Sequence, residues 1–230
     1  MSRSLNLNRG RLRPLIPIEN IMRVNLYRSM LLIFLSFSLN ATEKPNVLLI
    51  MVDDMNTMLS TYGDTQVKTP NLEKLKANGI QFNRAYVQYP QCTASRASML
   101  TGLYPGQNGV TQLRQHFRNY VPWVKTLPQV FKENGYYTAR VGKIFHYDVP
   151  REMGTDGMDD PISWIDKYNP VGIDRTDHKK TKWLGPRKPK DKWGGGAISW
   201  IRAGGSSQEH TDGIATQQAI KILDSKHPKK

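Results

Sequence analysis

The amino-acid sequence predicts an α/β fold with a mostly parallel central sheet. The first observation behind this prediction is a continuous apolar run at residues 46–52, which is typical of a strand buried on both faces. The second is a pair of amphipathic segments, at 69–79 and 127–134, that end at or just before a glycine, as helices do. A chain of 230 residues can bury a core of its own, so one folded domain is expected.

The expected elements alternate between strands and helices along the chain. Residues 80–87 are expected to form a strand that leads into Cys92, and a helix is expected from Ser95 onward. Two leucines of the first helix, Leu72 and Leu75, are expected to face the core. In chain order we predict a strand at 46–52, a helix at 69–79, a strand at 80–87, a helix from Ser95, a helix at 127–134, a strand at 136–141 and an amphipathic helix at 211–225.

The N-terminal residues are expected to serve export rather than the fold. Residues 22–41 have the layout of a secretory signal peptide, with two arginines before an apolar stretch at 30–39 and small residues after it. That stretch is too short for a stable membrane span, although an uncleaved anchor is the alternative. Residues 1–21 are interpreted as an upstream extension, which leaves 42–230 as the exported domain.

The charge balance restricts the classes of partner. The formal net charge is +14, and the excess is spread along the chain rather than gathered in one arm. Such an excess favours anionic partners in general, including sulfated sugars and phosphates. No nucleic-acid-reading motif accompanies it, so no nucleic-acid partner is predicted. The single cysteine excludes a disulfide within the chain.

Two adjacent carboxylates, Asp53 and Asp54, follow the predicted strand at 46–52 directly. The carboxyl end of a buried strand is where open α/β sheets bind their ligands. Two neighbouring negative charges repel each other unless a cation neutralises them, and oxygen ligands suit Ca²⁺ or Mg²⁺. A pair of loop-capping aspartates is the alternative interpretation.

The single cysteine, Cys92, lies where an irregular segment enters a predicted helix. The N–H groups at a helix N-terminus favour anions, and Arg96, one turn further on, adds a fixed cation. The alternative is that Cys92 is a small buried apolar residue, as free cysteines commonly are.

A third candidate site follows the predicted strand at 136–141. Lys143 and His146 lie three residues apart just beyond the strand end, so they are expected at the same sheet edge as Asp53. Without further context this pair is a weak signal, because lysine and histidine are common surface residues.

These segments together resemble those of a known family. Cys92-Thr-Ala-Ser-Arg96, followed by Leu100-Thr-Gly102, is similar to the sulfatase signature. The run at 46–54 resembles the opening strand of sulfatases, and 142–146 resembles their Gly-Lys-x-x-His element in the spacing of iduronate-2-sulfatase-like members. The resemblance implies an alkaline-phosphatase-like sandwich with helices on both faces of a mostly parallel sheet, incomplete at its C-terminus.

The resemblance also implies roles for these residues. Cys92 would be oxidised by a maturation enzyme to formylglycine, whose hydrate is the nucleophile. Asp53, Asp54 and the modified Cys92 would bind Ca²⁺, with Mg²⁺ as the less favoured ion. Arg96 and Lys143 would neutralise the sulfate, and His146 would hydrogen-bond the nucleophile. The implied function is hydrolysis of a sulfated glycan or another sulfate ester by an exported enzyme.

The resemblance covers residues 45–225 but only the N-terminal portion of a sulfatase. A further histidine, a second metal-binding pair and another lysine would be expected beyond it, so the 230 residues alone are expected to have little or no activity. Two other functions stay open: a phosphatase or phosphodiesterase of the same superfamily, and a non-catalytic anion-binding remnant.

Overall fold

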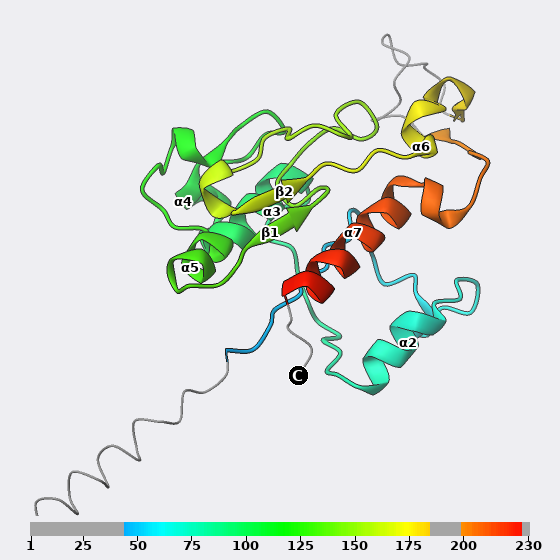
Figure 1. The fold of residues 1–230 in the computed structure, drawn as a ribbon, viewed down its shortest axis with the longest axis horizontal. Coiled ribbons are helices and arrows are strands. Elements are labelled where there is room, and N and C mark those ends of the chain that lie inside the picture. Colours follow the sequence, from blue (N-terminus) through cyan, green and yellow to red (C-terminus); the bar gives the residue numbers. More distant parts are fainter. Residues whose placement is uncertain (1–43, 185–198, 227–230) are drawn as a thin grey trace, which may run out of the picture. The chain divides into compact units, whose positions relative to one another are not determined.

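The computed structural model describes residues 44–184 and 199–226 (Figure 1). The predicted upstream extension at 1–21 and the predicted signal peptide at 22–41 lie outside these residues. The chain divides into two compact units between Leu49 and Ile50, and the described helices and strands all belong to the second unit. Within the described ranges, no helix combines the length and the apolar character needed to cross a bilayer.

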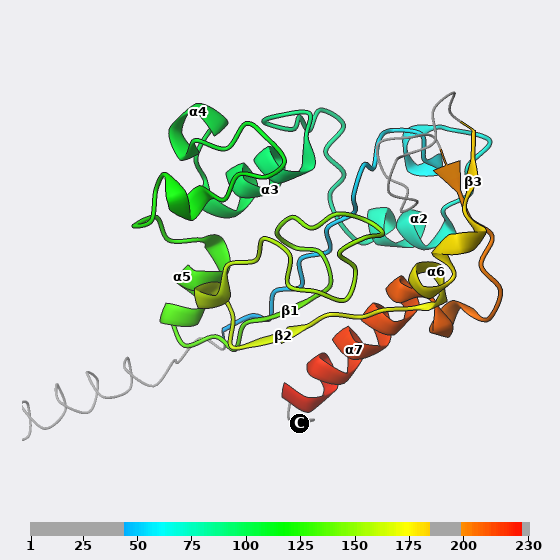
Figure 2. The ribbon, with the colours of Figure 1, turned by 90° about the horizontal axis from the view of Figure 1, so that it is seen from above.

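The described elements follow one another in a mixed α and β order (Figures 1 and 2). The helices are α2 (Pro70–Ala77), α3 (Cys92–Thr101), α4 (Pro105–Asn108), α5 (Leu127–Glu133), α6 (Ile173–Thr176) and α7 (Thr211–Lys226). The strands are β1 (Ala139–Val141), β2 (Asp166–Tyr168), β3 (Lys182–Trp183) and β4 (Ser199–Trp200). Short 3₁₀ turns occupy Ser60–Tyr62, Phe117–Asn119, Pro161–Ser163, His178–Lys180 and Ser207–Glu209.

The parallel pairing that the sequence predicts is present between β1 and β2. Ala139 lies opposite Asp166, and Val141 lies opposite Tyr168. The predicted strand at 136–141 is thus confined to its last three residues. The other pair, β3 and β4, is antiparallel. Helix α7 contacts β1, and both views show it running beside the β1–β2 pair (Figures 1 and 2).

The prediction of a buried strand at 46–52 is wrong. This segment pairs with no other described residue as a strand, and five of its apolar side chains are 46% to 71% exposed. A continuous apolar run indicates that a segment favours burial. It forms a strand only where a neighbouring strand supplies backbone hydrogen bonds on at least one side. None of the described strands pairs with 46–52.

The predicted strand at 80–87 is absent from the described structure for the same reason. Ile80 is 84% exposed, and no described strand pairs with the segment. The preceding helix, α2, is present, but its predicted inward leucines are not buried: Leu75 is 65% exposed and Leu72 lies at the surface. The helix follows from local signals, since a proline stands in its first turn, whereas the burial of its apolar face depends on a partner surface.

The core of the second unit is built around α3. Ala94, Ala97 and Leu100 lie on one face of this helix and are buried. Gly102, in the left-handed conformation with a φ of 71°, ends the helix as its C-cap. The buried apolar residues that complete this cluster are Val110, Phe117, Val121 and Phe145.

A local cap fixes the start of α5, whereas a contact with a distant helix holds the start of α7. The Thr126 hydroxyl accepts a hydrogen bond from the Gln129 backbone amide at 3.3 Å and so caps α5, which confirms the predicted helix at 127–134. Thr211, at the first position of α7, donates its hydroxyl proton to Asp174 of α6 at 2.8 Å. The last helix is present as predicted. The hydrogen bond between Thr211 and Asp174 joins it to α6.

Candidate functional site

Cys92 is the first residue of α3, which begins three residues before its predicted start at Ser95. The preceding residue, Gln91, is extended and its side chain does not cap the helix. The side chain of Gln91 therefore accepts no hydrogen bond from the first-turn N–H groups of α3. The positive end of the helix dipole lies beside Cys92. The half-buried Cys92 side chain places its Sγ 3.2 Å from Nδ1 of His146.

Arg96 lies one turn further along α3 and is almost wholly buried. Its Nη1 donates to the backbone carbonyls of Lys143 and Ile144, at 2.8 Å and 2.9 Å. Its Nη2 donates to Oδ1 of Asp53 at 2.9 Å. The planar guanidinium thus fixes three acceptors at once, which an ammonium group on a flexible stem would not do in the same geometry. Arg96 therefore joins α3 to the segment after β1 and to Asp53.

Asp53 is bound by two cations. Its second carboxylate oxygen accepts a hydrogen bond from Nζ of Lys143 at 2.6 Å. Partial burial by itself raises the pKa of Asp53, but the hydrogen bonds and positive charges of Lys143 and Arg96 outweigh burial and hold the pKa below its ordinary value. One carboxylate between two cations leaves a net positive charge at the site, which suits an anionic ligand.

Lys143 and His146 are positioned by the turn that ends β1. Gly142 adopts a φ of 71°, a conformation that glycine takes without steric cost, and turns the chain toward α3. The backbone carbonyl of His146 accepts a hydrogen bond from the amide of Met158 at 2.8 Å, which closes the following loop. Phe145, between the two site residues, is anchored in the core cluster.

The His146 ring is only 4% exposed. Burial lowers the pKa of His146 and the charge of Lys143 lowers it further, while the hydrogen bond with Asp148 acts in the opposite direction. The balance of these effects favours the neutral form of the ring. Its Nε2 lies 3.2 Å from Oδ1 of Asp148. Sequence reasoning missed Asp148, although its position two residues after a predicted site histidine is a signal that could have found it.

The structure brings together five of the six predicted site residues. Cys92, Arg96, Lys143, His146 and Asp53 form one connected cluster, in which each contacts at least one other member. We call these five residues the Cys92 cluster. Cys92 and Asp53 are linked through Arg96 and the Lys143–His146 segment rather than directly. Asp54 stands apart: its side chain is exposed, and its φ of 52° turns the backbone at that point.

The described residues do not by themselves fit a calcium or magnesium ion. Both carboxylate oxygens of Asp53 are already engaged by cationic donors. Within ranges 44–184 and 199–226, no three His, Cys, Asp or Glu side chains gather as a metal site would require. Hard divalent ions take six or more oxygen ligands, so this part of the chain supplies too few.

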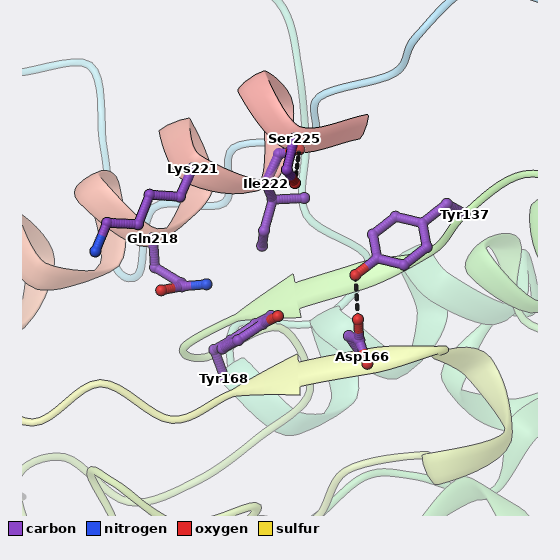
Figure 3. A pocket seen from close by; sticks show the side chains of 7 residues that line it. All are labelled: Tyr137, Asp166, Tyr168, Gln218, Lys221, Ile222 and Ser225. Carbon is purple, nitrogen blue, oxygen red and sulfur yellow. Dashed lines mark hydrogen bonds between the residues drawn. The ribbon is translucent and has the colours of Figure 1, made fainter. Parts of the chain in front are cut away.

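A separate hollow lies between α7 and the β1–β2 pair (Figure 3). It encloses about 260 Å³ and shares no residue with the Cys92 cluster. Figure 3 shows Tyr137 hydrogen-bonded to Asp166 on one side and Ile222 of α7 on the other. The other lining residues are Tyr168, Gln218, Lys221 and Ser225. Because its lining includes neither Cys92 nor His146, this hollow is not the candidate site.

Known proteins with similar sequences include several named as sulfatases. Iduronate 2-sulfatase of Mus musculus is 39% identical over 132 residues, which make up 57% of this chain and 23% of that protein. A sulfatase of Formosa agariphila is 36% identical over 122 residues, which make up 50% of this chain and 24% of that protein. This chain thus spans about a quarter of the length of these curated relatives.

One solved structure has a similar fold. The crystal structure of Ps i-CgsB superposes with a TM-score of 0.53 over 81% of this chain and 43% of that one, at 24% sequence identity. This likeness confirms the predicted fold class.

The profile of the family described as Sulfatase matches residues 45–230, which is most of the chain and includes every member of the Cys92 cluster. This chain therefore belongs to the sulfatase family.

Proposed function

We propose that the Cys92 cluster belongs to the active centre of a sulfuric ester hydrolase. The observation that carries this proposal is the convergence of Cys92, Arg96 and Lys143 with His146, although these residues come from two segments about fifty positions apart in the sequence. A sulfate ester needs a nucleophile at sulfur and fixed positive charge near the sulfuryl oxygens. The cluster offers both in one place.

The electrostatics of the cluster suit a sulfate group. The two positive charges of Arg96 and Lys143 outnumber the single negative charge of Asp53. The dipole at the N-terminus of α3 adds further positive potential. Arg96 is held by its three acceptors, and Lys143 is held by Asp53, so both charges are fixed before a substrate arrives. Preorganised charge of this kind stabilises a transition state without reorganisation at the moment of reaction.

The nucleophile is proposed to be Cys92 after oxidation to formylglycine by a maturation enzyme. The hydrate of that aldehyde supplies a hydroxyl group that can attack the sulfur. His146 presents Nδ1 to the side chain at position 92 and can hold or accept its proton. The position of Cys92 at the half-buried start of α3 is accessible to a ligand, unlike a cysteine packed in the core.

A divalent metal is proposed to complete the centre, as the family resemblance implies, with Asp53, Asp54 and the modified Cys92 as the candidate ligands from this segment. Since the described residues do not form a metal site, no reaction step is assigned to the metal.

The substrate is proposed to be a sulfated glycan or another sulfate ester, because the mouse relative is named for the sugar iduronate. Export through residues 22–41 is proposed with it.

A phosphatase of the same superfamily would need a hydroxyl nucleophile near position 92. The nearest candidate, Thr93, is buried and donates its hydroxyl proton to the carbonyl of Leu113 at 3.0 Å. Its side chain is thereby directed to a structural contact rather than to His146. This contact favours the sulfatase interpretation.

The test combines a chemical and a kinetic measurement. The 230-residue chain is produced together with a formylglycine-generating enzyme, and the peptide that contains Cys92 is weighed by mass spectrometry. We expect the lower mass of formylglycine, and we expect any aryl sulfate turnover to disappear in Cys92→Ala. An aryl phosphate serves as the comparison substrate. An unmodified thiol together with preferred hydrolysis of the phosphate ester would contradict the proposal.

A further inference from the structure

We propose that Asp148 is a positioning residue that holds His146 in one tautomer, with Nε2 protonated and Nδ1 unprotonated toward residue 92. This inference rests on the proposed function for its catalytic meaning, but the hydrogen-bond arrangement can be tested independently. The relevant geometry is a chain of three side chains. Sγ of Cys92 lies 3.2 Å from Nδ1 of His146, and Nε2 of the same ring lies 3.2 Å from Oδ1 of Asp148.

The chemistry of a carboxylate decides the tautomer. An ionised aspartate can only accept hydrogen bonds, so the proton between His146 and Asp148 must belong to Nε2. In the neutral ring, Nδ1 then carries the lone pair and faces the side chain of residue 92. The ring is 4% exposed, so bulk water cannot readily replace either contact. Asp148 thus determines which nitrogen is the acceptor.

The tautomer matters for the proposed reaction. With Nδ1 unprotonated, His146 can take the proton of a hydroxyl group on residue 92. The O–H bond breaks, an Nδ1–H bond forms, and the resulting imidazolium charge lies next to the Asp148 carboxylate. In the other tautomer Nδ1 already carries a proton and can only donate. The same logic orients the base in nucleophile–histidine–carboxylate triads.

The Asp148 carboxylate is itself held in place. Its second oxygen is paired with the Arg114 guanidinium, and the other end of that guanidinium donates to Oε1 of Glu152 at 2.8 Å. Oε2 of Glu152 accepts a hydrogen bond from the backbone amide of Asp148 at 2.8 Å. Arg114 therefore fixes the direction of the Asp148 carboxylate toward His146. Glu152 holds the turn at 148–152 through the Asp148 backbone amide, and the amide oxygen of a glutamine can accept the same hydrogen bond.

Glu152 provides a matched control for Asp148. Both are carboxylates, both pair with Arg114, and both are about a quarter exposed, with side-chain exposures of 24% for Glu152 and 27% for Asp148. Of these two carboxylates, only Asp148 hydrogen-bonds to the His146 ring in the described part of the chain. Substitution of either residue removes one negative charge from the same cluster, so a difference between the variants reports the contact with the ring.

The experiment is long-range ¹H–¹⁵N NMR of the ¹⁵N-histidine-labelled 230-residue chain, at a pH that keeps the ring neutral. The His146 signals are assigned from their loss in His146→Asn. We expect the Nε2–H tautomer in the wild type and in Glu152→Gln. In Asp148→Ala we expect a mixture with a substantial Nδ1–H fraction, because the acceptor that fixes the proton is gone. Asp148→Leu, which is close in size and offers no acceptor, replaces it if the alanine variant does not fold.

The outcomes separate the two proposals. An unchanged His146 tautomer in the folded Asp148 variant would overturn the positioning role, whether or not the chain hydrolyses sulfate esters. A tautomer shift equal in Glu152→Gln would also overturn it, because loss of charge would then explain the effect. Where the wild-type chain turns over an aryl sulfate, Asp148→Ala should lower kcat by about 100-fold with little change in KM. An unmodified Cys92 together with preferred hydrolysis of an aryl phosphate would contradict the proposed function alone.

Discussion

Arg96 and Asp53 are joined by an ion pair of 2.9 Å although they lie 43 residues apart in the sequence. The arginine side chain is 6% exposed and the aspartate side chain 35%. The aspartate stands in a segment that forms no strand among the described residues, so its contacts with Arg96 and Lys143 connect this segment to α3 and to the turn after β1. The same contacts hold the two cations of the Cys92 cluster in place.

Loss of the Asp53 charge should destabilise the fold. In Asp53→Asn, the buried Arg96 and the nearly buried Lys143 lose their shared counterion, and we expect the free energy of unfolding to fall by about 1–3 kcal/mol. Urea denaturation followed by circular dichroism measures the change. The control is Asp54→Asn at the neighbouring exposed position, where we expect a change within about 0.5 kcal/mol. Equal effects at both positions would contradict the role assigned to the ion pair.

The stabilisation by Asp53 should depend on pH. Its pKa in the folded chain lies below the ordinary value of 3.8, so the unfolded chain binds the proton more readily. The contribution to stability is therefore fully present above pH 3.8 and is lost as the pH falls through the lowered folded-state pKa. We expect the difference in unfolding free energy between wild type and Asp53→Asn to be constant near neutral pH and to shrink below 3.8. A difference that grows in acid would reverse the assigned sign.

The turn before Lys143 should tolerate no side chain. Gly142 has a φ of 71°, so Gly142→Ala places a Cβ in a left-handed conformation that costs about 1–2 kcal/mol. No atom lies closer than 3.9 Å to that Cβ, so backbone strain rather than a clash causes the loss. Thermal unfolding measures it. Gly106→Ala in α4 is the control, because its φ is not positive and its Cβ would meet nothing within 4 Å. That variant should be neutral or slightly stabilised.

The sequence determined those features that depend on near neighbours along the chain. Helix α3 begins at Cys92 and ends at Gly102, and α5 and α7 lie where the apolar spacing places them, because helical hydrogen bonds and caps connect residues three or four positions apart. The motif residues Cys92 and Arg96 share one helix, so their proximity could also be predicted locally.

The tertiary structure alone decided the contacts between distant segments. The apolar runs at 46–52 and 80–87 indicate a need for burial, but strand formation depends on a partner elsewhere in the chain, and the described residues supply none to either run. Asp148 contacts His146 because Arg114 orients its carboxylate, and no local pattern specifies that direction. The physical reason is that sequence spacing limits which side chains can meet within one element, whereas only folding brings separate elements together.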